Sequence, residues 1–129
     1  MSDKLRVGVI GLGFMGATHC AAYRQASGLC ELVAVCDPKA SRRGGQLGDV
    51  GGNLDGGQAT AAFDAGQVHG YETPAELLAD GDIDLVSICT RTDTHVELAC
   101  AAMHAGKHVL VEKPVALTTA DVQKVADVA

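Results

Sequence analysis

Three glycines between an apolar segment and a helical segment constrain this chain more than any other feature. Gly11, Gly13 and Gly16 follow the apolar residues 5–10, which predict a β-strand, and they open the alanine-rich residues 14–26, which predict an α-helix. In such a unit the first glycine permits a tight turn and the second lets phosphate groups approach the backbone. The third lets the helix pack closely on the strand, and the helix start offers free N–H groups to an anion.

Asp37 supports a dinucleotide site of the Rossmann type. It closes the next apolar segment, 31–37, and lies 21 residues beyond Gly16, near the offset of about 20 typical of such units. A carboxylate there accepts hydrogen bonds from ribose hydroxyls and repels a 2′-phosphate, which favours NAD over NADP. Three cations that follow could neutralise a phosphate or form a solvated helix face, so NADP stays open: Lys39, Arg42 and Arg43.

The rest of the chain alternates predicted strands and helices. Further strands are expected at 68–71, 84–89 and 108–111, and further helices at 38–43, 58–65, 74–80, 96–105 and from 119 onward. This alternation predicts a Rossmann-type, doubly wound α/β fold with a parallel sheet in the order 3-2-1-4-5. The apolar stripe of the last helix still runs at Ala129, so we expect the domain to be truncated before its final strand and before a C-terminal domain.

Turn and cap residues set the expected boundaries of these elements. A glycine-rich insert at about 44–57 disfavours a continuous helix after the second strand. Gly28 and Gly106 are expected helix stops. Three threonine–acid pairs predict N-terminal helix caps: Thr73 with Glu76, Thr94 with Glu97, and Thr118 with Asp121.

Composition narrows the class of protein. Hydrophobic residues make up 47% of the chain and aromatic residues only 3%, so the core must consist of Val, Leu, Ile and Ala. The net charge of −6, without a basic block, argues against a nucleic-acid or anionic-membrane partner. The polar start and the lack of a long apolar run favour a cytoplasmic location. The odd number of cysteines and the lack of ligand spacing predict reduced thiols and no metal site: Cys20, Cys30, Cys36, Cys89 and Cys100.

The segment from Thr90 to His95 follows the predicted strand at 84–89. Ligands of open α/β sheets bind outside the carboxyl ends of the strands where the strand order reverses, so this segment is a candidate wall of the site. The alternative is a cluster that caps the following helix. For His95 alone, packing or capping is as good an interpretation as ligand contact.

Glu112 and Lys113 follow the predicted strand at 108–111. Charged residues at the end of a buried strand are costly unless they face a site, although an ordinary ion pair is the alternative. Lys113 would lie near the nicotinamide end of a bound cofactor. The positive charge of oxidised nicotinamide would help this lysine release a proton, as proton transfer requires.

In this order and spacing, the glycine motif, Asp37, Thr90…His95 and Val111-Glu-Lys-Pro114 resemble the Gfo/Idh/MocA oxidoreductases, which include glucose–fructose oxidoreductase and inositol dehydrogenase. The resemblance covers the whole chain. It implies that residues 1–129 form an N-terminal NAD(P)-binding Rossmann domain. The family's C-terminal α/β domain, which carries much of the substrate site and the oligomer interface, would then be absent.

The resemblance also implies roles for individual residues. Asp37 would hold the adenosine ribose, while Thr90 and His95 would line the cofactor groove. Glu112 would contact the nicotinamide ribose, and Lys113 would be the active-site lysine. The diphosphate would be held by the loop and the first helical turn: Gly11, Gly13, Phe14, Met15 and Gly16.

Two features depart from the family pattern. Arg91 and Thr92 stand where the family often has Pro and a small residue, and Arg91 could reach the cofactor or the substrate. The glycine-rich insert is longer than the family's usual helix and loop. It lies near the adenosine end of the site, so it can change the preference between NAD and NADP.

The implied function is hydride transfer between NAD(P) and a sugar, cyclitol or related polyol, in a homo-oligomeric parent protein. Lys113 would assist proton transfer or polarise the substrate oxygen. The alternative is a non-catalytic sensor that uses cofactor binding to control a partner. In either case we expect the 129-residue chain alone to bind cofactor without catalysis.

Overall fold

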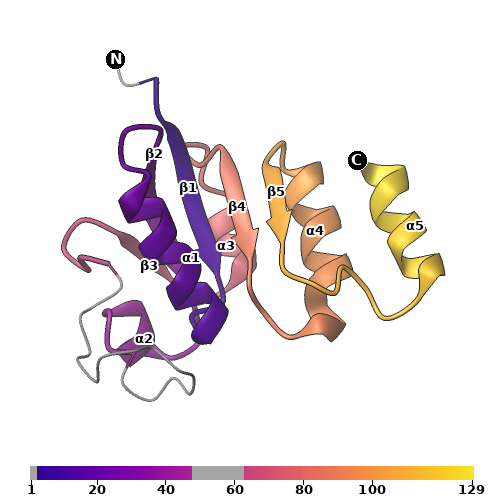
Figure 1. The fold of residues 1–129 in the computed structure, drawn as a ribbon, viewed down its shortest axis with the longest axis horizontal. Helices are drawn as coiled ribbons and strands as arrows, with labels where there is room; N and C mark the ends of the chain where they lie inside the picture. The colour runs from indigo at the N-terminus through magenta and orange to yellow at the C-terminus, as the bar shows by residue number, and fades with distance from the viewer. Residues whose placement is uncertain (1–2, 48–62) are drawn as a thin grey trace.

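The structure is a computed structural model that describes residues 3–47 and 63–129, and a five-stranded parallel sheet forms its centre. The strands lie in the order β3-β2-β1-β4-β5, and in Figure 1 their arrows point to one common edge. This confirms the Rossmann-type fold class and the predicted order. The strands are β1 (Leu5–Ile10), β2 (Cys30–Cys36), β3 (His69–Tyr71), β4 (Leu85–Ile88) and β5 (His108–Val111).

Helices cover both faces of the sheet (Figure 1). Helix α1 packs on one face, whereas α3 and α4 pack on the other, and α5 packs on the outside of α4. Right-handed crossovers that run in both directions from β1 produce this two-sided cover. The helices are α1 (Phe14–Gln25), α2 (Ala40–Arg43), α3 (Pro74–Leu78), α4 (His95–His104) and α5 (Thr119–Val128), and a 3₁₀ turn, η1 (Thr92–Thr94), precedes α4.

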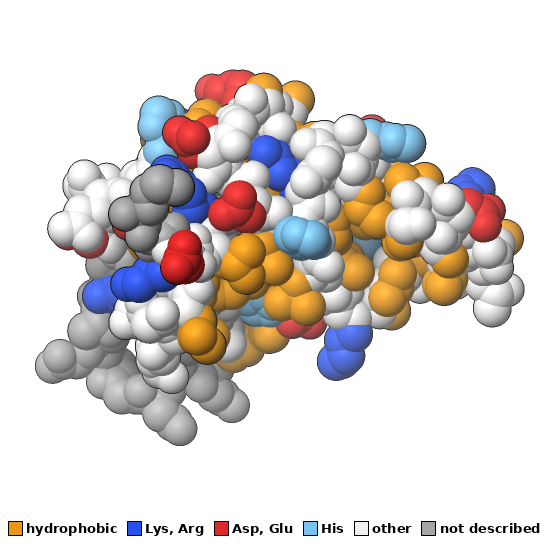
Figure 2. All heavy atoms as spheres, turned by 90° about the horizontal axis from the view of Figure 1, so that it is seen from above, with side chains coloured by type: hydrophobic (Ala, Val, Ile, Leu, Met, Phe, Trp, Pro, Cys, Tyr) orange, Lys and Arg blue, Asp and Glu red, His pale blue; other side chains and the backbone are white. Residues whose placement is uncertain are grey.

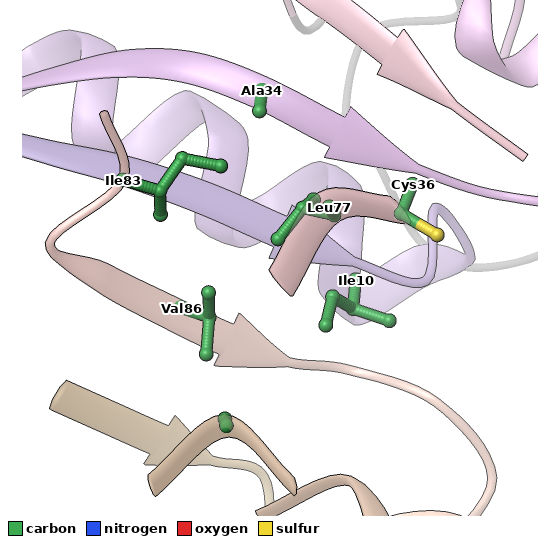
Figure 3. Packing of buried hydrophobic residues seen from close by; sticks show 7 residues of the cluster. Ile10, Ala34, Cys36, Leu77, Ile83 and Val86 are labelled. Carbon is green, nitrogen blue, oxygen red and sulfur yellow. The ribbon is translucent and has the colours of Figure 1, made fainter. Parts of the chain in front are cut away.

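Aliphatic side chains make up most of the core on both faces, as the low aromatic content predicts, but Phe63, Cys20 and Cys36 also belong to it. Figure 3 shows the layer between the sheet and α3, where Leu77 lies among side chains of β1, β2 and β4. This layer consists of Ile10, Ala34, Cys36, Leu77, Ile83, Val86 and Ala102. The layer under α1 consists of Val9, Leu12, Cys20, Leu32, Val35 and Phe63. The two layers fix the sheet, and with it the positions of the strand ends.

Two of the three predicted helix caps are confirmed. The Thr73 hydroxyl accepts the N–H of Glu76 at 3.4 Å, and the Thr118 hydroxyl accepts the N–H of Asp121 at 3.1 Å. Gly106 has a φ of +78°, the left-handed conformation expected just after α4.

The predicted cap at Thr94 is wrong. Its hydroxyl donates to the carbonyl of Arg91 at 2.7 Å and lies 2.6 Å from the Thr90 hydroxyl, so it accepts no N–H from Glu97. The physical reason is η1, which brings Thr94 to the helix with a ψ of −7° instead of the extended conformation of a capping residue.

Some predicted boundaries also differ from the structure. Helix α1 ends before Gly28, because the N–H of Ala26 already closes its last turn on Ala22. The helix expected at 38–43 begins only at Ala40. The helix expected at 58–65 and the insert at 44–57 lie largely outside the described residues, and residues 63–65 are not helical.

All five cysteines are free thiols, and burial raises the pKa of Cys20, Cys36 and Cys89 to about 12. In the view of Figure 2, acidic and basic side chains alternate over the surface without a block of one sign. Within residues 3–47 and 63–129, no helix is long and apolar enough to cross a membrane.

Candidate functional site

The candidate residues lie in one row along the carboxyl edge of the sheet. Three backbone hydrogen bonds align the segments that follow the strands: Gly11 N to Cys36 O at 2.8 Å, Cys89 N to Ile10 O at 2.8 Å, and Glu112 N to Ile88 O at 3.0 Å. The edge therefore presents Asp37 after β2, the glycine loop after β1, Thr90 after β4 and Glu112 after β5. From β2 to β5 it spans three strand spacings, roughly 14 Å.

The glycine loop leaves no room for side chains at two of its three positions. Gly11 has a φ of +92°, and a Cβ there would lie 2.7 Å from the Cys89 carbonyl. A Cβ on Gly16 would lie 1.7 Å from the Gly11 carbonyl oxygen. At Gly13 an added Cβ meets no atom within 4 Å, so the space over this residue is open. The loop is thus tightly closed beneath and open above, as a backbone that receives phosphate groups requires.

The start of α1 suits an anion placed over this loop. Gly13 is the N-cap residue, no acidic residue occupies the first turn, and no side chain caps it. The first N–H groups of a helix have no partner within the helix and carry a partial positive charge. Phe14 and Met15 follow directly and are partly exposed, at 36% and 37%. The backbone therefore fits the diphosphate of a dinucleotide.

Asp37 is buried and connects the loop to β2. One carboxylate oxygen accepts the N–H of Leu12 at 3.0 Å, and the other accepts the N–H of Lys39 at 2.9 Å. Each carboxylate oxygen can accept a further hydrogen bond, so the group can hold a ribose hydroxyl while it holds the loop.

The guanidinium groups of Arg42 and Arg43 contact the Asp37 turn. Arg43 Nη1 donates to the carbonyls of Asp37 and Pro38 at 2.9 and 3.0 Å. Arg42 Nη1 lies 3.8 Å from Asp37 Oδ2. These contacts differ from the solvated helix face considered from the sequence, and they add positive charge at the end of the row where the adenosine would lie.

Thr90 lies directly against the glycine loop, since its Cγ2 would be 3.1 Å from a Cβ on Gly11. His95 lies deeper and is 1% exposed. Its Nε2 is 3.0 Å from the Thr90 carbonyl, and its Nδ1 is 2.8 Å from the Pro114 carbonyl. His95 therefore joins the segments after β4 and β5 from below, and any role in a cofactor groove is exercised through their backbone.

Arg91 is exposed to solvent and contacts none of the other candidate residues through the ion pair that it forms. Its side chain is 85% exposed and pairs with Asp93 at 3.0 Å. Its contact with cofactor or substrate stays a prediction.

Glu112 and Lys113 end the row after β5. The Glu112 side chain is 22% exposed, and its Oε2 accepts the N–H of Lys113 at 3.2 Å. Its Oε1 lies 2.8 Å from His19 Nε2, and this hydrogen bond holds the pKa of Glu112 below its usual range. Lys113 itself is exposed at the edge of the site.

The structure adds three residues that the sequence reasoning missed. His19 on α1 contacts Ser87 in the middle of β4 at 3.1 Å as well as Glu112, and the Tyr23 hydroxyl lies 2.5 Å from Ser87 Oγ. A signal was present: Gly16, His19 and Tyr23 recur at helical spacing on the face that packs on the sheet. Ser87 is likewise the one polar residue in the apolar run of β4, so both elements had a polar group to satisfy.

Within the described ranges, no three His, Cys, Asp or Glu side chains are grouped so that they could hold a metal ion. The row instead offers a diphosphate cradle between a carboxylate for a ribose and a Glu-Lys pair. This arrangement can bind a dinucleotide along the edge and place its reactive end beside Lys113.

Comparisons with known proteins agree with this geometry. Residues 5–129 match the family described as "Oxidoreductase family, NAD-binding Rossmann fold". An inositol 2-dehydrogenase of Salmonella paratyphi B is 33% identical over 125 residues, which cover 95% of this chain and 32% of that protein. The rhizopine catabolism protein MocA of Rhizobium meliloti is 32% identical over 126 residues, which cover 98% of this chain and 34% of that protein.

Among solved structures, an NAD binding oxidoreductase from Klebsiella pneumoniae superimposes with a TM-score of 0.77 at 31% identity, covering 99% of this chain and 32% of that one. A levoglucosan dehydrogenase in complex with NADH superimposes with a TM-score of 0.76 at 28% identity, covering 98% and 32%. The chain spans about a third of the length of the curated relatives it matches. The chain belongs to the Gfo/Idh/MocA oxidoreductase family and forms its NAD-binding Rossmann fold.

Proposed function

We propose that this chain is the cofactor domain of an oxidoreductase that moves a hydride between NAD and a CH–OH carbon of a sugar, cyclitol or related polyol. One observation carries the proposal: Asp37, the glycine loop, Thr90 and Glu112-Lys113 follow four adjacent strands and meet at one edge. The names of the relatives, inositol 2-dehydrogenase and levoglucosan dehydrogenase, support the substrate class.

We propose the following division of labour along the edge. Asp37 orients the adenosine ribose, and the amides of Gly13, Phe14 and Met15 hold the diphosphate. Thr90 forms the wall beside the loop. When bound, the nicotinamide supplies or accepts the hydride. Lys113 Nζ takes the proton of the substrate hydroxyl when the alcohol is oxidised and returns it in the reverse direction.

We propose further that this domain works with a C-terminal domain that supplies the rest of the substrate site. The threefold greater length of the relatives supports such a partner. Homo-oligomerisation and the choice of polyol would then depend on that second domain.

Calorimetric titration of the chain with NAD and with NADP tests the cofactor part. We expect NAD to bind more tightly, because the buried carboxylate of Asp37 repels a 2′-phosphate. Tighter binding of NADP would assign Arg42 and Arg43 to the phosphate and would refute the preference. Failure of the folded chain to bind either nucleotide would refute the function.

Hydride exchange with a panel of polyols tests the catalytic part in the two-domain protein. Lys113→Ala should lower kcat by at least about 10²-fold, as expected for an acid–base group, while NAD binding persists. Lys124→Ala is the matched control, because Lys124 is an exposed lysine on α5 that pairs with Asp121 on the same helix. NAD binding without exchange on any polyol would favour the cofactor sensor instead.

A further inference from the structure

A chain of polar side chains runs beneath the nicotinamide end of the row, between α1 and the sheet. His19 Nε2 lies 2.8 Å from Glu112 Oε1, and His19 Nδ1 lies 3.1 Å from Ser87 Oγ. The Tyr23 hydroxyl contacts the same Ser87 oxygen at 2.5 Å. The His19 side chain is only 14% exposed, and Ser87 is fully buried. Ser87 and Glu112, which lie 68 and 93 positions beyond His19 in the sequence, are therefore joined through the imidazole of His19.

With a neutral imidazole at His19, the chemistry of the partners assigns the protons. An ionised carboxylate only accepts hydrogen bonds, so His19 Nε2 carries the proton that faces Glu112. In a neutral imidazole Nδ1 is then an acceptor, and Ser87 donates to it. Ser87 Oγ in turn accepts from the Tyr23 hydroxyl. Each of these four side chains therefore has a hydrogen-bond partner. Among the described residues, no buried side-chain nitrogen or oxygen lacks one.

We propose that His19 is a positioning residue: its Nε2–H, held in this tautomer by Ser87, fixes the carboxylate of Glu112 beside Lys113 at the nicotinamide end of the site. This inference rests on the proposed function, because it assigns Glu112 to the end of the row where nicotinamide lies. His19 acts through Glu112 and does not itself reach the edge.

The carboxylate is held from two sides. His19 contacts one oxygen at 2.8 Å, and the Lys113 N–H donates to the other at 3.2 Å. The hydrogen bond from His19 is the largest cause that lowers the pKa of Glu112. A negative charge of fixed position beside the ring stabilises the positively charged oxidised nicotinamide more than the neutral reduced one. His19 should thus raise the affinity for NAD⁺ relative to NADH.

Two substitutions distinguish the roles of the two ring nitrogens of His19. His19→Gln keeps an amide donor near the position of Nε2 but cannot accept from Ser87 at the position of Nδ1, and it preserves the bulk of the side chain. His19→Ala removes both contacts. His104→Gln is the control, because His104 is exposed at the end of α4.

Three measurements test the inference on the chain itself. Nitrogen-15 NMR should show His19 protonated on Nε2 and unprotonated on Nδ1. Carbon-13 NMR should show the Glu112 titration midpoint rising in His19→Ala and largely restored in His19→Gln. Titration calorimetry should show the ratio of NAD⁺ to NADH affinity falling about fivefold in His19→Ala, with no change in His104→Gln.

A proton on Nδ1 instead of Nε2, or an unchanged Glu112 midpoint in His19→Ala, would overturn the inference. So would an unchanged affinity ratio in a folded His19→Ala that still binds NAD⁺, since His19 would then only support packing. If His19→Ala does not fold, His19→Leu, which keeps the bulk of the side chain but donates no hydrogen bond, takes its place: a ratio about fivefold lower than in His19→Gln supports the inference, and an equal ratio overturns it. Absence of binding by the unsubstituted chain would instead refute the proposed function.

Discussion

Gly16→Ala should destabilise the domain, because a side chain at this position collides with the glycine loop itself. A Cβ on Gly16 would lie 1.7 Å from the Gly11 carbonyl oxygen, and real Cβ contacts are not shorter than 3.0 Å. The obstacle is backbone, so α1 must shift away from β1. Overpacking of this kind costs about 1–3 kcal/mol, and the upper end applies where backbone must move. The higher helix propensity of alanine offsets up to about 1 kcal/mol. The free energy of unfolding should therefore fall by about 2 kcal/mol in Gly16→Ala.

The matched variant is Gly13→Ala, whose Cβ meets no atom within 4 Å. Its free energy of unfolding should fall by less than about 1 kcal/mol, which is the scale of a substitution at an N-cap. The new methyl group would instead occupy the space for the diphosphate and lower the affinity for NAD at least about tenfold, or 1.4 kcal/mol.

Thermal unfolding and calorimetric titration of both variants check this pair. A loss of 2 kcal/mol corresponds to a fall in Tm of roughly 6–8 °C for a domain of this size. A Tm of Gly16→Ala equal to that of the unsubstituted chain would rule out the predicted collision, and undiminished NAD affinity of Gly13→Ala would rule out a diphosphate over Gly13.

Two further predictions concern titratable side chains. The Tyr71 hydroxyl donates to Asp80 Oδ2 at 2.7 Å, and this contact raises the pKa of Tyr71 to about 12. Because the folded value exceeds the unfolded value near 10, the contact stabilises fully below pH 10 and is lost as the pH rises toward 12. Urea unfolding should therefore show Tyr71→Phe about 1 kcal/mol less stable at pH 8 and nearly equal to the unsubstituted chain near pH 12. A deficit that stays constant with pH would contradict this account. The thiols of Cys20, Cys36 and Cys89, whose pKa burial raises to about 12, should react with a disulfide reagent at pH 8 only after unfolding, and rapid reaction of all five cysteines in the folded chain would contradict it.

The sheet and the row of site residues could be predicted from local sequence. Alternating apolar strands and helices, together with right-handed crossovers, leave few possible strand orders. Once β1 and β4 are neighbours, the residues that follow them must meet at one edge, so Gly11 and Thr90 come together without any knowledge of side chains.

The contacts of His19, Ser87 and His95 could not be predicted in this way. Each joins residues far apart in sequence through side-chain hydrogen bonds. The pairing of the donor and acceptor atoms depends on how α1 and α4 pack on the sheet. The capping pattern at Thr94 failed for a related reason. A competing bond to Arg91 O turned its hydroxyl away from the helix start, and sequence spacing does not show such competition.

In the proposed complex, NAD lies along the carboxyl edge from Asp37 to Lys113. Titration of the chain with NAD, followed by the backbone amide signals in two-dimensional NMR, tests this placement residue by residue. We expect saturable shifts at Gly13, Phe14 and Met15, at Asp37, and at Glu112 and Lys113. Shifts confined to residues outside this edge, such as Arg24 and Gln67 in the groove lined by α1, β2 and residues 63–68, or no saturable shift at all, would refute this placement.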